Sequence, residues 1–157
     1  MHVDSWRSTY PGLMPDAYLS SLDATERAVR WERMLARAGR REMVYVAEEA
    51  GQVIGFAAGG PERDGNPLFR GELYAIYLLQ PAQGQGWGRA LVSAVASHLL
   101  AWGMRNMLVW VLRDNRPARR FYEHLGGRYL SSRITEFEGV TVPEVSYGWP
   151  DARDLTA

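Results

Sequence analysis

The chain has 157 residues, the size of one ordinary domain, and 46% of them are hydrophobic, which is enough for a sizeable core. Its formal net charge is zero, and it contains no Cys and no Lys. These facts exclude disulfides, thiolate metal sites, a lysine Schiff base and a broad basic surface for nucleic acid or membranes. No apolar run approaches the roughly 20 residues of a membrane helix. We expect a single cytoplasmic domain over residues 1–157, without a metal, nucleic acid or membrane partner.

The N-terminal third is predicted to be helical and then to form a hairpin. The first forty residues read as helical, with breaks at Pro11-Gly12 and Pro15. Apolar runs then predict strands at 43–48 and 52–59, with a turn between them. Turn-forming residues predict a loop at 61–67.

Strands and helices alternate in the rest of the chain. We expect further strands at 72–79, 107–112, 128–138 and 142–149. We expect helices at 86–102, which stops at Gly103, and at 115–125, which Asn115 caps. This order predicts an α/β (α+β) fold with one mixed, mostly antiparallel sheet and helices on both of its faces.

The segment Gln83-Gly84-Gln85-Gly86-Trp87-Gly88-Arg89 joins a buried strand to the strongest helix. Glycines let the backbone turn tightly and approach a ligand, and a helix N-terminus offers N–H donors to phosphate oxygens. A P-loop needs a Lys, and a dinucleotide fingerprint needs its third glycine one residue later, where Arg89 stands. The segment therefore predicts a phosphate cradle. The alternatives are a tight structural turn and the dinucleotide site of an oxidoreductase.

At these residues the chain resembles the GNAT superfamily of N-acetyltransferases. The family's Q/R-x-x-G-x-G/A signature stands at Gln83 to Gly88, and its N-x-x-A-x-x-F-Y-E-x-L-G-F block resembles residues 115–127. Softer likenesses at residues 5–12 and 145–151 extend the resemblance over nearly the whole chain. Family members usually begin with one more strand, which we expect to be missing here. The strand at 43–48 would then have an open edge, so we expect a homodimer by edge pairing or by exchange of the strand at 142–149.

The resemblance implies an enzyme that moves an acetyl group from acetyl-CoA to a primary amine of a small molecule, directly and through a tetrahedral intermediate. The pyrophosphate would bind the glycine loop, and the pantetheine arm would pair with the preceding strand, whose Leu78 N–H would face the acetyl oxygen. The cofactor-binding residues implied are Ile76, Tyr77, Leu78, Gln83, Gly84, Gln85, Gly86, Trp87, Gly88, Arg89, Asn115 and Tyr122. Alternatives are a non-catalytic acyl-CoA sensor and a protein N-acetyltransferase. Trp110 stands where the ribosomal-protein enzymes of the family carry a Glu.

Two side chains are candidates for moving protons. Tyr122 follows Asn115 by two helical turns, on the same side of the helix, and by the resemblance its phenol donates to the departing thiolate. Core packing is the alternative role of Tyr122. Glu72 lies where several family members place a catalytic Glu, and it is the candidate base; a solvated strand-end carboxylate is its alternative. The identity of the acceptor is not encoded in a readable motif, although Trp6, Tyr10, Trp31 and Tyr74 suggest an aromatic wall.

Overall fold

Three helices open the chain. The computed structural model describes residues 1–37, 41–137 and 139–156. The helices are α1 (His2–Thr9), α2 (Asp16–Ser21) and α3 (Ala24–Arg37). The predicted breaks are confirmed, because Gly12 has a φ of +75° and α2 begins directly after Pro15. The Asp23 carboxylate accepts the N–H groups of residues 25 and 26 at 2.8 and 2.9 Å, so it starts α3.

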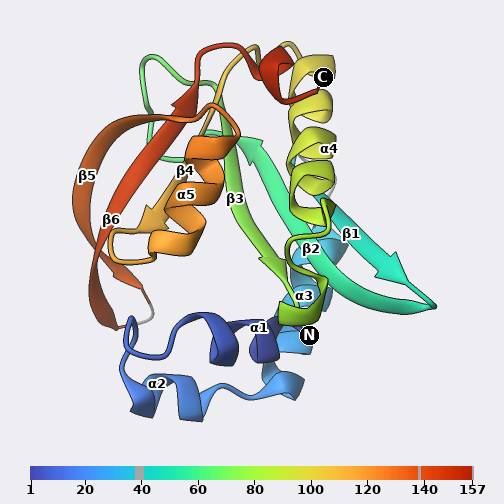
Figure 1. Cartoon of the computed structure of the whole chain (residues 1–157), viewed down its shortest axis with the longest axis vertical. Coiled ribbons are helices and arrows are strands. Elements are labelled where there is room, and N and C mark those ends of the chain that lie inside the picture. Colours follow the sequence, from blue (N-terminus) through green and yellow to red (C-terminus); the bar gives the residue numbers. More distant parts are fainter. Residues whose placement is uncertain (38–40, 138, 157) are drawn as a thin grey trace.

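Six strands form one sheet in the described part of the chain, in the order β1-β2-β3-β4-β6-β5 (Figure 1). They are β1 (Met43–Glu49), β2 (Gln52–Pro61), β3 (Gly71–Leu78), β4 (Met107–Leu112), β5 (Arg128–Phe137) and β6 (Val140–Trp149). The β3–β4 pair is parallel, and the other neighbouring pairs are antiparallel. The predicted mixed, mostly antiparallel sheet is thus confirmed. Residue 138, the predicted end of the fifth strand, lies outside the described residues.

Helices cover both faces of the sheet. On one face, α4 (Trp87–Ala101) packs on β1, β2 and β3, and α5 (Arg116–His124) lies in front of the sheet in Figure 1. On the other face, α1 and α2 contribute to a second core, which includes Trp6 and Leu112. Val111 belongs to the first core and its neighbour Leu112 packs on the second. Because successive strand residues point to opposite faces, the two cores lie on opposite sides of the sheet.

The parallel strands β3 and β4 separate toward their C-terminal ends, as Figure 1 shows. They pair only where 71–73 of β3 meets 107–109 of β4. The β2–β3 register shifts at the same place, since Ala58 faces Ala75 whereas Gly59 faces Leu73, which leaves Tyr74 as an extra residue. Such a bulge increases the local twist of a strand. It therefore turns the rest of β3 away from β4 and leaves a gap in the sheet.

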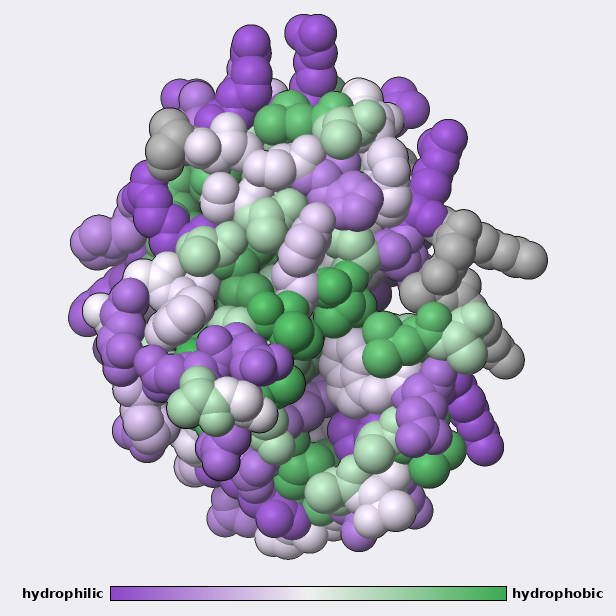
Figure 2. Space-filling model, turned by 90° about the vertical axis from the view of Figure 1, so that its right-hand side faces the viewer, coloured by the Kyte–Doolittle hydropathy of each residue, from purple (hydrophilic) through white to green (hydrophobic). Residues whose placement is uncertain are grey.

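The described residues also form two short 3-10 helices: η1 (Gln80–Ala82) before the glycine loop, and η2 (Ala152–Leu155) against α4. Figure 2 views the side of the molecule where β1 and α4 lie, and hydrophobic residues gather in the middle of this face among hydrophilic ones. At the edge of the sheet, Val46 of β1 and Val53 of β2 are exposed by 57% and 42%. The β1 edge is therefore partly apolar.

Candidate active site

The gap between β3 and β4 is the centre of a cavity of about 910 Å³, a volume typical of small-molecule sites. Residues 74–78 and 109–112 of the two strands line its middle. The glycine loop and α5 line one side, and α1, the segment after it and the β5–β6 hairpin line the other. The cavity therefore reaches both faces of the sheet.

The glycine loop opens α4 with two left-handed residues. Gly84 has a φ of +75° and Gly86, the N-cap of α4, a φ of +91°; an added Cβ would meet no atom within 4 Å at either position. Gly88 differs, because a Cβ there would lie 3.1 Å from the Phe121 ring. The first two glycines are needed for backbone conformation and leave open space before the helix N-terminus, which fits a phosphate group. The third is needed for packing of α5 against α4.

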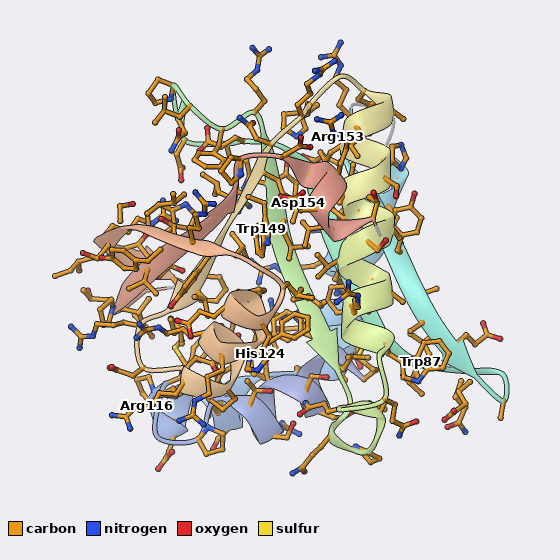
Figure 3. All side chains as sticks on the ribbon, turned by 45° about the horizontal axis from the view of Figure 1, so that its top comes forward. Trp87, Arg116, His124, Trp149, Arg153 and Asp154 are labelled. Carbon is orange, nitrogen blue, oxygen red and sulfur yellow. The ribbon has the colours of Figure 1, made fainter. Side chains whose placement is uncertain are left out.

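The side chain of Asn115 begins α5, and its Oδ1 accepts the N–H of Ala118 at 3.2 Å, as the predicted cap requires. Asn115 and Tyr122 are both 5% exposed and both line the cavity. Burial raises the pKa of Tyr122 well above its ordinary value. Trp149 of β6 donates from Nε1 to the Leu125 carbonyl at 2.8 Å, which fastens the end of α5 to the sheet (Figure 3). The phenol of Tyr122 is thus held in place and protonated at neutral pH.

Glu72 is buried but does not line the cavity. Its carboxylate accepts three hydrogen bonds from Arg63: from the backbone N–H at 3.1 Å, from Nε at 3.2 Å and from Nη2 at 2.6 Å. Arg63 itself lines the cavity. Glu72 therefore holds Arg63 in place, and its own side chain is not part of the cavity lining.

Most of the other predicted cofactor residues lie together on the cavity wall. The residues brought together are Ile76, Tyr77, Leu78, Gln83, Gly84, Gly86, Gly88, Arg89, Asn115 and Tyr122. Gln85 and Trp87 are absent from the lining. Gln85 donates from Nε2 to the Pro81 carbonyl at 2.7 Å, and Figure 3 shows Trp87 beside the β1–β2 hairpin, away from α5. Alternate residues of the loop thus face away from the cavity.

Sequence reasoning missed a set of polar residues on the side of the cavity formed by α1 and the β5–β6 hairpin. Arg133 donates from Nε to Glu144 at 2.9 Å and also pairs with Asp64, while its guanidinium lies 3.8 Å from the centroid of the Trp110 ring. The Arg133–Glu144 pair could have been found from Gly139, which lies between the predicted strands at 128–138 and 142–149. A tight hairpin there pairs 137 with 140, and hence Arg133 with Glu144, as the β5–β6 register does.

Three further tyrosines, Tyr10, Tyr74 and Tyr77, line the cavity. The hydroxyls of Tyr10 and Tyr77 lie 3.1 Å apart, and burial raises the pKa of both. Tyr74 donates to the Pro61 carbonyl at 2.6 Å, and its ring lies 4.1 Å from the Arg63 guanidinium. Burial raises the pKa of Tyr74 to about 12. All of these phenols are therefore protonated donors near neutral pH.

Two absences hold for the described residues. No group of three or more His, Asp or Glu side chains there is arranged to hold a metal ion. None of the helices in that part of the chain has both the length and the apolar composition to cross a membrane.

A model described as the Acetyltransferase (GNAT) family matches residues 4–127. YuaI, an uncharacterised N-acetyltransferase of Bacillus subtilis (strain 168), is 42% identical over 156 residues, which cover 99% of this chain and 87% of that protein. PaiA N-acetyltransferase of Thermoplasma acidophilum, solved in complex with coenzyme A, has a TM-score of 0.67 at 17% identity and covers 94% of this chain and 87% of its own. For yncA of Salmonella typhimurium, solved with its cofactor acetyl-CoA, the TM-score is 0.60 at 22% identity, with 82% and 74% covered. At these identities the two structures show a shared fold.

Proposed function

Because this chain belongs to the GNAT family of N-acetyltransferases, we propose that it moves the acetyl group of acetyl-CoA to a primary amine of a small molecule. The observation that carries this proposal is the cavity that joins the glycine loop to a polar and aromatic chamber through the gap between β3 and β4. Acetyl-CoA can enter the gap from one face of the sheet, and an amine can reach its thioester from the other face.

The open edge of β3 and the glycine loop support the placement of the cofactor. Beyond Leu73 the strand has no ladder pairing with β4, so the backbone of residues 76–78 can pair with the amide groups of a pantetheine arm. The pyrophosphate then lies at Gly84 and Gly86 before α4. Arg89 also lines a second cavity of about 280 Å³ together with His124 and Asp154, and we place the nucleotide end of coenzyme A there.

The reaction has two requirements that residues of the cavity would meet. When the amine nitrogen attacks the thioester carbon, the carbonyl oxygen becomes an oxyanion, and the N–H of Leu78 would donate to it. When the carbon–sulfur bond breaks, the thiolate takes up negative charge, and the Tyr122 hydroxyl would donate to the sulfur. The attacking nitrogen is that of the neutral amine; it loses one proton, the coenzyme A sulfur gains one, and the products are an N-acetylated amine and free coenzyme A. Glu72 has no part in this scheme, because Arg63 occupies its carboxylate.

A thiol-release assay with acetyl-CoA and a panel of primary amines tests the proposal. We expect amine-dependent release of coenzyme A and an acetylated product by mass spectrometry. Tight binding of acetyl-CoA without turnover on any amine would favour a sensor, and calorimetric binding of NAD or NADP instead of acetyl-CoA would favour an oxidoreductase.

We also propose that the chain forms a homodimer through the β1 edge. In the described residues β1 is the outermost strand on its side of the sheet, and Val46 and Val53 expose apolar surface beside it. An unpaired edge of this kind is a template for pairing with a second copy. Light scattering across a dilution series measures the stoichiometry, and a monomer mass at every concentration would refute the dimer.

A further inference from the structure

The chamber at the end of the cavity opposite the glycine loop has an aromatic wall, formed by Trp6, Tyr10, Tyr77 and Phe137, all of which line the cavity. The centroid of Trp6 lies 4.8 Å from that of Tyr10 and 5.2 Å from that of Phe137. Tyr10 and Tyr77 are 6.3 Å apart and meet edge to face. Because the rings pack against one another, the wall is rigid and apolar, with the two hydroxyls as its polar part. It suits a flat, apolar body.

The positive charges of this chamber already have carboxylate partners. Arg63 is paired with the buried Glu72, and Arg133 is paired with both Asp64 and Glu144. Each guanidinium is also stacked on a ring, Arg63 on Tyr74 and Arg133 on Trp110. Three carboxylates thus balance two guanidinium groups, and Glu136 adds a further carboxylate to the lining. A ligand carboxylate would find no uncompensated cation among these residues and would face negative charge.

Glu144 is the carboxylate best placed to receive a cation. It lines the cavity, and its side chain is 17% exposed. Arg133 occupies its Oε2 from one side, whereas a carboxylate can accept about four hydrogen bonds, so the group keeps capacity for a ligand. It also lies on the face of the sheet that carries the aromatic wall, because it stands opposite Leu112 in the β4–β6 ladder, and Leu112 packs, as Tyr10 does, on the core cluster that contains Trp6. Glu144 therefore borders the wall on the side away from the glycine loop.

We infer that the acceptor is a primary amine with a flat apolar body and no carboxylate, and that Glu144 binds its ammonium group while the aromatic wall holds the body. This inference rests on the proposed function, because it places the amine at the acceptor end of the same cavity. It names Glu144 as a residue that determines specificity for amines over alcohols and over amino acids. Arg133 is a positioning residue, which holds Glu144 toward the chamber.

Three ligands that differ by one group test the inference in the wild-type protein saturated with coenzyme A. 2-Phenylethylamine carries the ammonium, 2-phenylethanol lacks the charge, and phenylalanine adds a carboxylate. Calorimetry should give 2-phenylethylamine at least about tenfold tighter binding than either of the others, the size expected for a hydrogen bond to a charged group. Equal or tighter binding of phenylalanine, or no preference for the amine over the alcohol, would overturn the inference.

Two variants locate the effect. In Glu144→Gln, binding of 2-phenylethylamine should weaken about tenfold or more to the level of the alcohol, while binding of the alcohol stays unchanged. Glu49→Gln is the control, because it removes an exposed carboxylate of β1 that is not part of the cavity lining, and it should leave all three affinities unchanged. Circular dichroism and coenzyme A affinity check that each variant is folded. An amine preference that survives in Glu144→Gln would assign the ammonium to another group and refute the role of Glu144.

The outcomes separate this inference from the proposed function. If amine binding depends on Glu144 but no amine is acetylated, the proposed function fails and the subsite stands. If amines that carry a carboxylate are acetylated, with release of coenzyme A, in preference to amines that lack one, the proposed function stands and the inference fails.

Discussion

Replacing Tyr122 with Phe removes one oxygen atom from the candidate active site and leaves the ring in place. The ring centroid lies 6.2 Å from that of Trp149 and 6.3 Å from that of Tyr147, and the residue is 5% exposed. Because Phe keeps these contacts, we expect the fold and the affinity for acetyl-CoA to change little. The effect of the substitution should therefore appear in turnover.

The size of the effect follows from the acidity of the two partners. Burial raises the pKa of Tyr122 above its ordinary value of about 10, whereas an ordinary thiol has a pKa of about 8.5. Full proton transfer from this phenol to the thiolate is therefore uphill, and the main contribution is a hydrogen bond to the developing negative sulfur. Hydrogen bonds to charged groups are worth about 1.5–3 kcal/mol, so we expect kcat to fall by roughly 10- to 150-fold.

Thiol detection measures kcat and KM for the variant, and calorimetry measures its dissociation constant for acetyl-CoA. Tyr45→Phe is the matched control, because it removes a hydroxyl that contacts His98 outside the cavity lining. A Tyr122→Phe enzyme with less than about a threefold loss in kcat would return Tyr122 to a packing role. An equal loss in acetyl-CoA affinity would show that the hydroxyl acts in binding instead.

Three further predictions concern the loop, the buried ion pair and alkaline pH. Gly86→Ala places an L-residue at a φ of +91° and should cost about 1–2 kcal/mol of stability in urea unfolding. Gly103→Ala, at +80° outside the cavity, should cost the same, and only the Gly86 variant should weaken coenzyme A binding in calorimetry. Glu72→Gln should lower the free energy of unfolding by about 1–3 kcal/mol while leaving the shape of the pH–rate profile unchanged, and loss of the rise in rate with pH on the acidic side would restore Glu72 as the base. Burial raises the pKa of Tyr77 and Tyr122 in the folded protein. Their contribution to the free energy of unfolding is therefore complete below the pKa of tyrosine in the unfolded chain, about 10, and is lost as pH rises further. Urea unfolding midpoints measured at pH 8, 10 and 11 should fall only above pH 10.

The fold was largely predictable because its signals are local. Helix α5 begins where Asn115 supplies a cap and ends before Gly126, which has a φ of +82°. The cofactor side of the site is local as well, since a strand, a glycine loop and a helix N-terminus follow one another directly in the chain. What could not be predicted there was the orientation of single side chains. Trp87 stands between two glycines of the motif, yet the first turn of α4 carries it away from the cavity.

The acceptor side of the site could not be predicted, because its residues meet only in the folded sheet. Glu72 looked like a free base from sequence because its strand is apolar; Arg63, nine positions earlier in a loop, gives it three hydrogen bonds. Arg133 reaches Asp64 across 69 positions, and it reaches Glu144 through the hairpin register. Each pairing removes a charge that the sequence alone would count as available to a ligand. Specificity in this chamber therefore depends on the balance of charge after folding: Arg133 is shared by the two carboxylates Asp64 and Glu144, so Glu144 beside the aromatic wall keeps capacity for the amine.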